Sequence, residues 1–131
     1  MLMPVCLLQA QPVVQQSADT VRVTTPDVCL LFKKADVKAV AKLFNPVIEL
    51  AMPESSQPTY ARAQAEQILK KFFDEKKPFN CVQTHRLTRD NDDCTVARLY
   101  TEKGMFRLSV RMRPVEGALR IYSIQIAEDN D

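Results

Sequence analysis

The most constraining feature of the chain is a regular alternation of side chains on both sides of Lys103–Gly104. A two-residue hairpin turn at this point fixes the register of the two flanking strands. The pairs on one face are all small or apolar: Thr101 with Phe106, Leu99 with Leu108, Ala97 with Val110 and Thr95 with Met112. The pairs on the other face are Tyr100 with Arg107, Arg98 with Ser109 and Val96 with Arg111. This consistent split predicts an antiparallel hairpin with one buried face and one polar face.

Two more strands extend the hairpin into a four-stranded meander. Residues 116–118 (Glu-Gly-Ala) lead into a last strand that is expected to point three side chains inward: Tyr122, Ile124 and Ile126. Residues 90–93 are expected to form the first turn, after a strand over 79–89 that alternates poorly. By the same parity, the inward side chains of that strand are Val82, Thr84, Arg86 and Thr88. This set is too polar for a sealed core.

Three helices are expected ahead of the meander. Residues 25–27 (Thr-Pro-Asp) are typical of a helix start, with Thr25 as the capping hydroxyl, and Asp36 can cap a second helix. A longer amphipathic helix covers 61–76, and a short strand over 47–52 precedes it. The order ααβαββββ predicts an α+β fold, in which a cone-like curved antiparallel sheet packs on three helices in the N-terminal half of the chain.

The first residues resemble a targeting segment. Residues 1–10 (MLMPVCLLQA) are short and apolar and end on a small residue, as the tail of a secretory signal peptide does, although a basic opening segment is missing. The expected organisation is a signal-peptide remnant over 1–10, a polar leader over 11–24 and a single domain over 25–128. An extracytoplasmic location, periplasmic or secreted, follows from this interpretation. The alternative is a hydrophobic N-terminus with no targeting role.

The four cysteines are Cys6, Cys29, Cys81 and Cys94. No two of them have the short spacing of a zinc or redox site, and a single histidine argues against a mixed metal site. Cys29 falls among the apolar residues of the first predicted helix, so we expect a small buried thiol there. No metal and no cofactor are expected.

Four short segments carry a family resemblance: 31–36 (LFKKAD), 41–45 (AKLFN), 63–69 (AQAEQIL) and 104–108 (GMFRL). They resemble a family of small secreted bacterial domains of unknown function within the nuclear transport factor 2-like (cystatin-like α+β) superfamily. The resemblance covers about residues 27–127 and implies a cavity between sheet and helices, which some members use for catalysis and many for binding or dimerisation. Ala61 departs from the family, where a capping serine is usual; Thr59 can substitute.

Composition excludes several classes of function. A net charge of +2 is too small to indicate nucleic-acid binding, and no apolar run approaches the roughly 20 residues of a membrane span. Gly104 and Gly117 are the only glycines and both fall at predicted hairpin turns, so glycine-rich phosphate loops are excluded. His85 is the only imidazole, and it is expected on the outer sheet face with Gln83 and Arg98, which disfavours a cysteine or serine nucleophile.

One candidate site is a small-molecule pocket at the mouth of the cone, formed by Arg86, Thr84, Tyr122 and Glu49. An inward Arg86 must pair with an acid or bind an anionic ligand, because an unpaired buried charge is costly. Glu49 is the natural partner, and it is also the only nearby carboxylate for an enzyme of isomerase or hydrolase type. A bulge that turns Arg86 outward is the alternative. We assign no catalytic residues.

The other candidate site is the outer face of the meander, called here the arginine face: Arg98, Tyr100, Arg107, Ser109, Arg111 and Arg113. Arginine is favoured at protein interfaces, so this face predicts a contact with a second copy of the chain or with an acidic protein partner. The alternative is a solvated face whose arginine stems cover apolar surface, with Arg107 stacked on Tyr100. The leading hypothesis for function is a non-catalytic binding or interaction module that can dimerise through this face.

Overall fold

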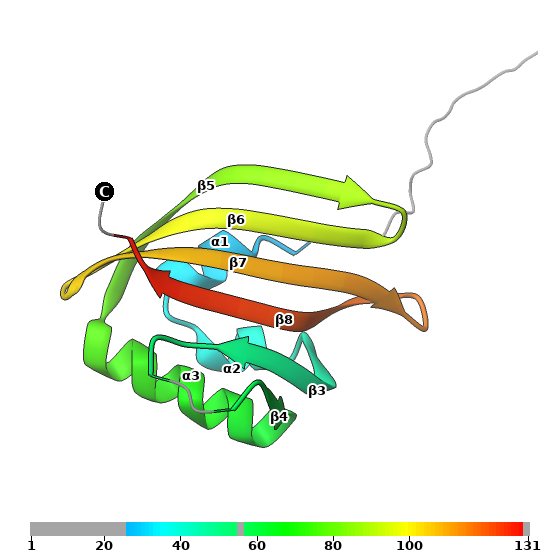
Figure 1. Cartoon of the computed structure of the whole chain (residues 1–131), viewed down its shortest axis with the longest axis horizontal. Coiled ribbons are helices and arrows are strands. Elements are labelled where there is room, and N and C mark those ends of the chain that lie inside the picture. The colour runs from blue at the N-terminus through cyan, green and yellow to red at the C-terminus, as the bar shows by residue number, and fades with distance from the viewer. Residues whose placement is uncertain (1–25, 55–56, 130–131) are drawn as a thin grey trace, which may run out of the picture.

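The computed structural model describes residues 26–54 and 57–129 (Figure 1). The helices are α1 (Val28–Lys33), α2 (Val37–Ala41) and α3 (Arg62–Lys76). The strands are β3 (Phe44–Ala51), β4 (Thr59–Ala61), β5 (Pro78–Arg89), β6 (Asp92–Thr101), β7 (Gly104–Val115) and β8 (Ala118–Glu128). This order confirms the predicted α+β class and adds the short strand β4, which the sequence did not predict. The predicted signal remnant, the leader and Thr25 lie outside the described residues.

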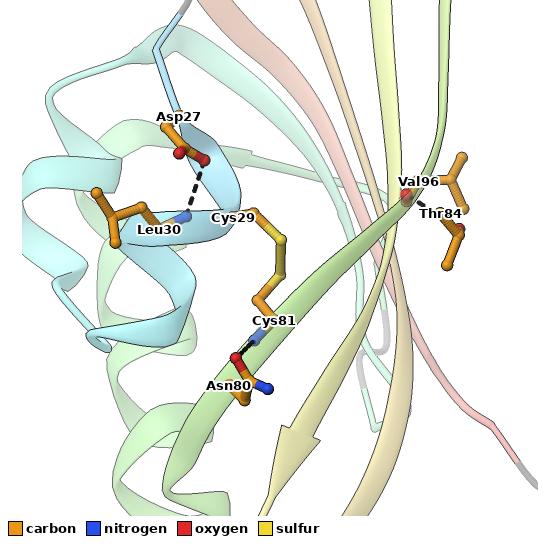
Figure 2. The surroundings of a disulfide bond; sticks show 7 residues. All are labelled: Asp27, Cys29, Leu30, Asn80, Cys81, Thr84 and Val96. Atoms are coloured by element: carbon orange, nitrogen blue, oxygen red, sulfur yellow. Dashed lines mark hydrogen bonds between the residues drawn. A yellow bond between two sulfur atoms is a disulfide. The ribbon is translucent and has the colours of Figure 1, made fainter.

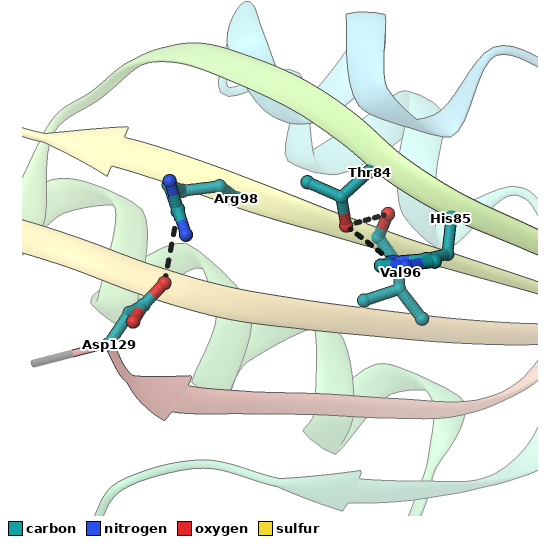
Figure 3. Close-up of polar contacts among 5 residues, drawn as sticks. All are labelled: Thr84, His85, Val96, Arg98 and Asp129. Carbon is teal, nitrogen blue, oxygen red and sulfur yellow. Dashed lines mark hydrogen bonds and ion pairs between the residues drawn. The ribbon is translucent and has the colours of Figure 1, made fainter. Parts of the chain in front are cut away.

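The strands form one curved sheet in the order β4-β3-β8-β7-β6-β5 (Figure 1). The pair β3–β8 is parallel, and the other four pairs are antiparallel. The helices pack against one face of this sheet, called here the covered face. No described helix covers the opposite, open face, which Figure 3 views with the helices behind the sheet. The two faces therefore meet different surroundings, as the predicted alternation requires.

Aromatic side chains connect the helices to the covered face. Phe32 of α1 meets Phe73 of α3 edge to face, with ring centroids 5.4 Å apart. Phe72 meets Phe106 of β7 in the same way at 5.1 Å. Edge-to-face contacts between rings stabilise the core in addition to the burial of their apolar surface. All four rings belong to the one core cluster, which fixes α1 and α3 on the sheet.

The hairpin between β6 and β7 has the predicted faces but a register shifted by two residues. Thr101 pairs with Gly104, so Glu102 and Lys103 form the turn instead of Lys103 and Gly104. The Thr101 hydroxyl donates to the Gly104 carbonyl at 2.7 Å and accepts from the Lys103 N–H at 3.0 Å. Gly104 takes the positive φ of +120° that returns the chain to the sheet. A shift of two residues leaves every side chain on its predicted face.

Two bulges place other side chains on the face opposite to the predicted one. The register of β5 shifts between Gln83 and His85, which leaves Arg86 opposite Thr95 on the covered face. Ahead of the bulge, Val82 lies opposite Arg98 on the open face, so its predicted inward orientation is wrong. A bulge adds one residue to one strand and reverses the parity beyond it. A poorly alternating sequence gave no position for that extra residue.

The second bulge lies in β8, where this strand pairs with β7. Arg111 pairs with Ser123 while the next residue, Met112, pairs with Ile121, so Tyr122 is the extra residue. Tyr122 lies on the open face, and its predicted inward orientation is wrong. Ile124 and Ile126 are buried in the core as predicted.

A disulfide bond joins Cys29 of α1 to Cys81 of β5 (Figure 2). The two Cα atoms are 5.4 Å apart, although 52 positions separate the residues in the sequence. The prediction of a buried free thiol at Cys29 is therefore wrong. The sequence signal was weak because the partner lies in a distant strand, and only the packing of α1 against β5 brings the two sulfurs together. Cys94 keeps a free thiol.

The helix starts are mostly those the sequence indicates. The Asp36 carboxylate accepts the Ala39 N–H at 3.1 Å, which confirms the predicted cap of the second helix. The cap of α1 is Asp27, which accepts the Leu30 N–H at 3.0 Å. Helix α3 begins after Ala61 with no side-chain cap, and Thr59 lies in β4 instead of replacing the missing serine. Among the described helices, none is long and apolar enough to cross a membrane.

Candidate functional site

The register of β6 and β7 places the whole arginine face on the open side of the sheet. Arg98 lies opposite Arg107, and Ser109 lies opposite Val96. The side chains of these residues alternate with the buried residues of the same strands. Like charges directly opposite each other destabilise a strand pair, so Arg98 and Arg107 need compensation.

At one end of this face, Asp129 compensates Arg98 (Figure 3). The Arg98 Nε donates to Asp129 Oδ2 at 3.0 Å, and the aspartate side chain is only 5% exposed. Hydrogen bonding to Tyr100 and, next, to Asp129 raises the pKa of Arg98 above its ordinary value. Tyr100 and Asp129 therefore both stabilise the charged guanidinium of Arg98.

At the other end, Tyr122 is the centre of a second cluster. The Arg113 guanidinium lies over the Tyr122 ring, 3.8 Å from its centroid. Asp92 contacts both residues, with its oxygens 3.4 Å from the Tyr122 hydroxyl and 3.6 Å from the Arg113 Nε. Hydrogen bonding to Tyr122 raises the pKa of Arg111, the next arginine on this strand face. The arginine–tyrosine stack that the sequence suggested for Arg107 and Tyr100 is thus formed by another pair, Arg113 and Tyr122.

An apolar strip borders the arginine face along the edge strand β5. It consists of Val82, Leu87, Cys94 and Val96, with His85 on the same face between Val82 and Leu87. The Val82 residue is 46% exposed and Leu87 is 66% exposed, which is high for side chains of this size. The strip was not predictable from strand alternation, because the bulge in β5 brings Val82 to the same face as Leu87. Together, the strip and the arginines make a surface with an apolar part and a charged part.

A polar hollow with a volume of about 280 Å³ lies on the covered face, between the start of α1 and strands β5 and β6. Arg86 lines it together with Gln83, Thr95 and Asp27. The Arg86 guanidinium binds Asp93 through two hydrogen bonds, Nε to Oδ1 at 3.2 Å and Nη2 to Oδ2 at 2.7 Å. This hydrogen bonding raises the pKa of Arg86. Arg86 therefore points inward and has an acidic partner, but that partner is Asp93 and not Glu49.

The four residues predicted as a ligand pocket do not lie together. Glu49 is an exposed residue of β3, and three strands separate β3 from β5 in the sheet. Thr84 lies on the side of β5 away from α1, where its hydroxyl donates to the Val96 carbonyl at 3.1 Å (Figure 2). Tyr122 lies on the open face. Of this set only Arg86 lines the hollow, and a ligand role for it stays a prediction.

Metal-ligating side chains are not clustered among the described residues, and the imidazole lies away from the hollow. Within 26–54 and 57–129, no three His, Cys, Asp or Glu side chains are grouped so that they can hold a metal ion. The ring of His85 lies beside Thr84, with Nδ1 3.2 Å from the Thr84 hydroxyl (Figure 3). That contact is exposed and belongs to the open face, away from the hollow.

A curved sheet with helices on one face defines the class: a nuclear transport factor 2-like α+β domain. Within this class the chain belongs to the DUF4783 family, described as a domain of unknown function, whose family model matches residues 25–127. A search of the curated proteins finds no match.

Solved structures agree with this assignment. A DUF4783 family protein from Bacteroides fragilis YCH46 is similar with a TM-score of 0.75 and 25% identity, covering 81% of this chain and 100% of that one. A nuclear transport factor 2-like protein of unknown function from Cytophaga hutchinsonii has a TM-score of 0.57 and 17% identity, covering 84% of this chain and 94% of that one. A putative calcium/calmodulin dependent protein kinase II association domain from Xanthomonas campestris has a TM-score of 0.56 and 19% identity, covering 78% and 80%.

Proposed function

We propose that the protein is a non-catalytic interaction module and that its open sheet face binds a second copy of the chain. The observation that supports this most directly is the apolar strip at the edge of the arginine face, where Val82 and Leu87 are 46% and 66% exposed. Tyrosine and arginine are enriched at interface centres, and an apolar patch beside them supplies the area that association needs. No described helix covers this face.

A symmetric contact would bring the two charged ends of the face together. Each end carries one arginine–aspartate pair, Arg98 with Asp129 at one end and Arg113 with Asp92 at the other. A two-fold axis that runs across the strands lays one end of the first copy on the opposite end of the second. The Asp129 of one copy then faces the Arg113 end of its partner. The apolar strips can meet in the same arrangement.

The excess of arginine over aspartate gives the dimer a recognisable salt dependence. The arginine face has four arginines, and Asp92 and Asp129 balance two of them. The net positive charge that remains makes two copies repel each other. Salt weakens this repulsion, because the screening length is only about 10 Å at an ionic strength of 0.1 M. Self-association should therefore strengthen as ionic strength rises. Binding of an acidic protein partner to the same face would weaken instead.

Sedimentation velocity of the chain at low and high salt, with surface variants, tests the proposal. The double variant Val82→Lys with Leu87→Lys is expected to be monomeric, because it places charge in the apolar strip and adds to the positive charge of the face. Leu30→Lys is the control, since Leu30 is 41% exposed but lies on α1 behind the covered face. A monomeric unmodified chain, or equal loss of association in the control, would rule out the proposed dimer.

The disulfide supports a location for this module outside the cytoplasm. Disulfides persist in oxidising compartments and are rare where thiol reductants are abundant. The bond between Cys29 and Cys81 is therefore in keeping with an exported protein, as the first ten residues suggest.

A further inference from the structure

A second hollow, which the proposed dimer does not use, lies beside α3. Its volume is about 230 Å³, and it is bounded by α3, the residues that follow β3, and the ends of β7 and β8. The floor is apolar, formed by Tyr60, Ile68, Phe72 and Phe106 among others. Small-molecule sites are concave and mainly apolar, with a few polar groups that orient the ligand. The hollow beside α3 has this composition.

The rim of this hollow is charged, and its net charge is opposite to that of the chain. Three carboxylates, Glu54, Glu75 and Glu128, and two ammonium groups, Lys71 and Lys76, line it. Three negative and two positive charges leave the rim at −1, whereas the whole chain carries +2. This excess of one carboxylate favours a cationic ligand over an anionic one.

The aromatic floor already holds one cation. The Lys76 ammonium lies over the Phe106 ring, 5.9 Å from its centroid. Aromatic faces attract ammonium groups, and the interaction strengthens where water is excluded. Glu128 lies beside the same ring, because Glu128 and Phe106 are cross-strand neighbours. An aromatic face and a carboxylate thus converge at one end of the hollow.

We propose that the hollow beside α3 binds a small organic cation with an aromatic or apolar body, of the arylalkylamine class. The body would lie on Ile68, Phe72 and Phe106. The ammonium group would face Glu75 and Glu128 and take the place of the Lys76 ammonium near the ring. The hollow lies on the helix side of the sheet, so this site is independent of the open face.

The proposal is tested with two probes of similar shape and opposite charge, tryptamine and indole-3-propionate. Calorimetric titration of the full chain should show binding of tryptamine at least about tenfold tighter than binding of the propionate, which is the size of effect expected from one favourable and one unfavourable charge contact. Amide shifts in two-dimensional NMR should centre on Ile68 and Phe106. Equal affinity for the two probes, binding of neither, or shifts centred elsewhere would overturn the proposal.

Two charge variants make the test specific. Glu75→Gln with Glu128→Gln should weaken tryptamine binding by about fivefold to tenfold and should reduce the preference over the propionate. Both residues are exposed, so the fold is expected to survive. Glu49→Gln with Glu116→Gln makes the same change in net charge away from the hollow and should leave binding unchanged. If this control weakens binding as much as the rim variant does, the rim carboxylates do not hold the ammonium.

Discussion

Two regions of the covered face, the part beneath the helices and the corner beside the β5–β6 turn, follow the same strand alternation but have opposite compositions. In the part beneath the helices, the inward residues Leu99, Leu108 and Ile126 are at most 3% exposed. At the β5–β6 corner, whose turn reaches past the helices in Figure 1, the inward residues are Asp93 and Arg86, although Met112 in the neighbouring strand β7 is buried in the core. One sheet face can therefore hold both a sealed core and a wet polar hollow. The difference lies in what covers each region.

The largest expected effect is in the part beneath the helices. Leu108→Ala should lower the free energy of unfolding by about 2–5 kcal/mol, because it removes buried methyl groups and leaves a cavity in a fully packed strand. Thr95→Ala, on the same face at the β5–β6 corner, should change it by less than about 1 kcal/mol. Urea denaturation followed by circular dichroism measures both. Equal losses would show that the two regions are packed alike.

Removal of the disulfide should have the next largest effect. The variant Cys29→Ser with Cys81→Ser is expected to lose roughly 2–4 kcal/mol, because the unfolded chain gains the freedom that a long closed loop had removed. This cross-link lies at the boundary between the two regions, where α1 is the element that covers β5. Cys94→Ser serves as the control and should unfold at the same urea concentration as the unmodified chain. A loss below about 1 kcal/mol would mean that α1 holds β5 by packing alone.

The smallest expected effect is at the polar β5–β6 corner. Asp93→Asn should cost about 1 kcal/mol, since it leaves Arg86 without its charge partner but the arginine side chain, 41% exposed, regains water. Asp92→Asn is the neighbouring control on the open face and should cost less, because its contact with Arg113 is longer at 3.6 Å. Thermal unfolding of both variants provides the comparison. A larger loss for Asp92→Asn would reverse this ranking of the two faces.

The sequence predicted the elements that depend on local periodicity. The alternation of residues 95–112 identified both faces of the central hairpin even though its register was two residues off, since such a shift leaves each side chain on its face. The cap at Asp36 and the long helix α3 were predicted for the same local reasons.

The candidate sites were harder to predict because they depend on bulges and distant contacts. One extra residue near Thr84 and another at Tyr122 reversed the expected orientations, and neither has a local signal. The partner of Arg86 was missed because Asp93 was assigned to a turn, although it is the second residue of β6 and faces inward. The disulfide depends on helix α1 packing against β5, which no spacing between cysteines reveals.

The link between Cys29 and Cys81 also decides how the domain transmits mechanical force. A pull on the chain ahead of α1, resisted at the C-terminus, reaches Cys29, the second residue of the helix, and passes through the two sulfurs into β5. Residues 30–80, which include α2, β3, β4 and α3, lie outside this covalent path. Cys81 and Glu128 lie in one row across the sheet, through Leu99 and Phe106, so the tension enters and leaves at the same end of the meander and loads the hydrogen bonds nearest that end first. Under stretching, the domain therefore behaves as a meander with a shielded helical half.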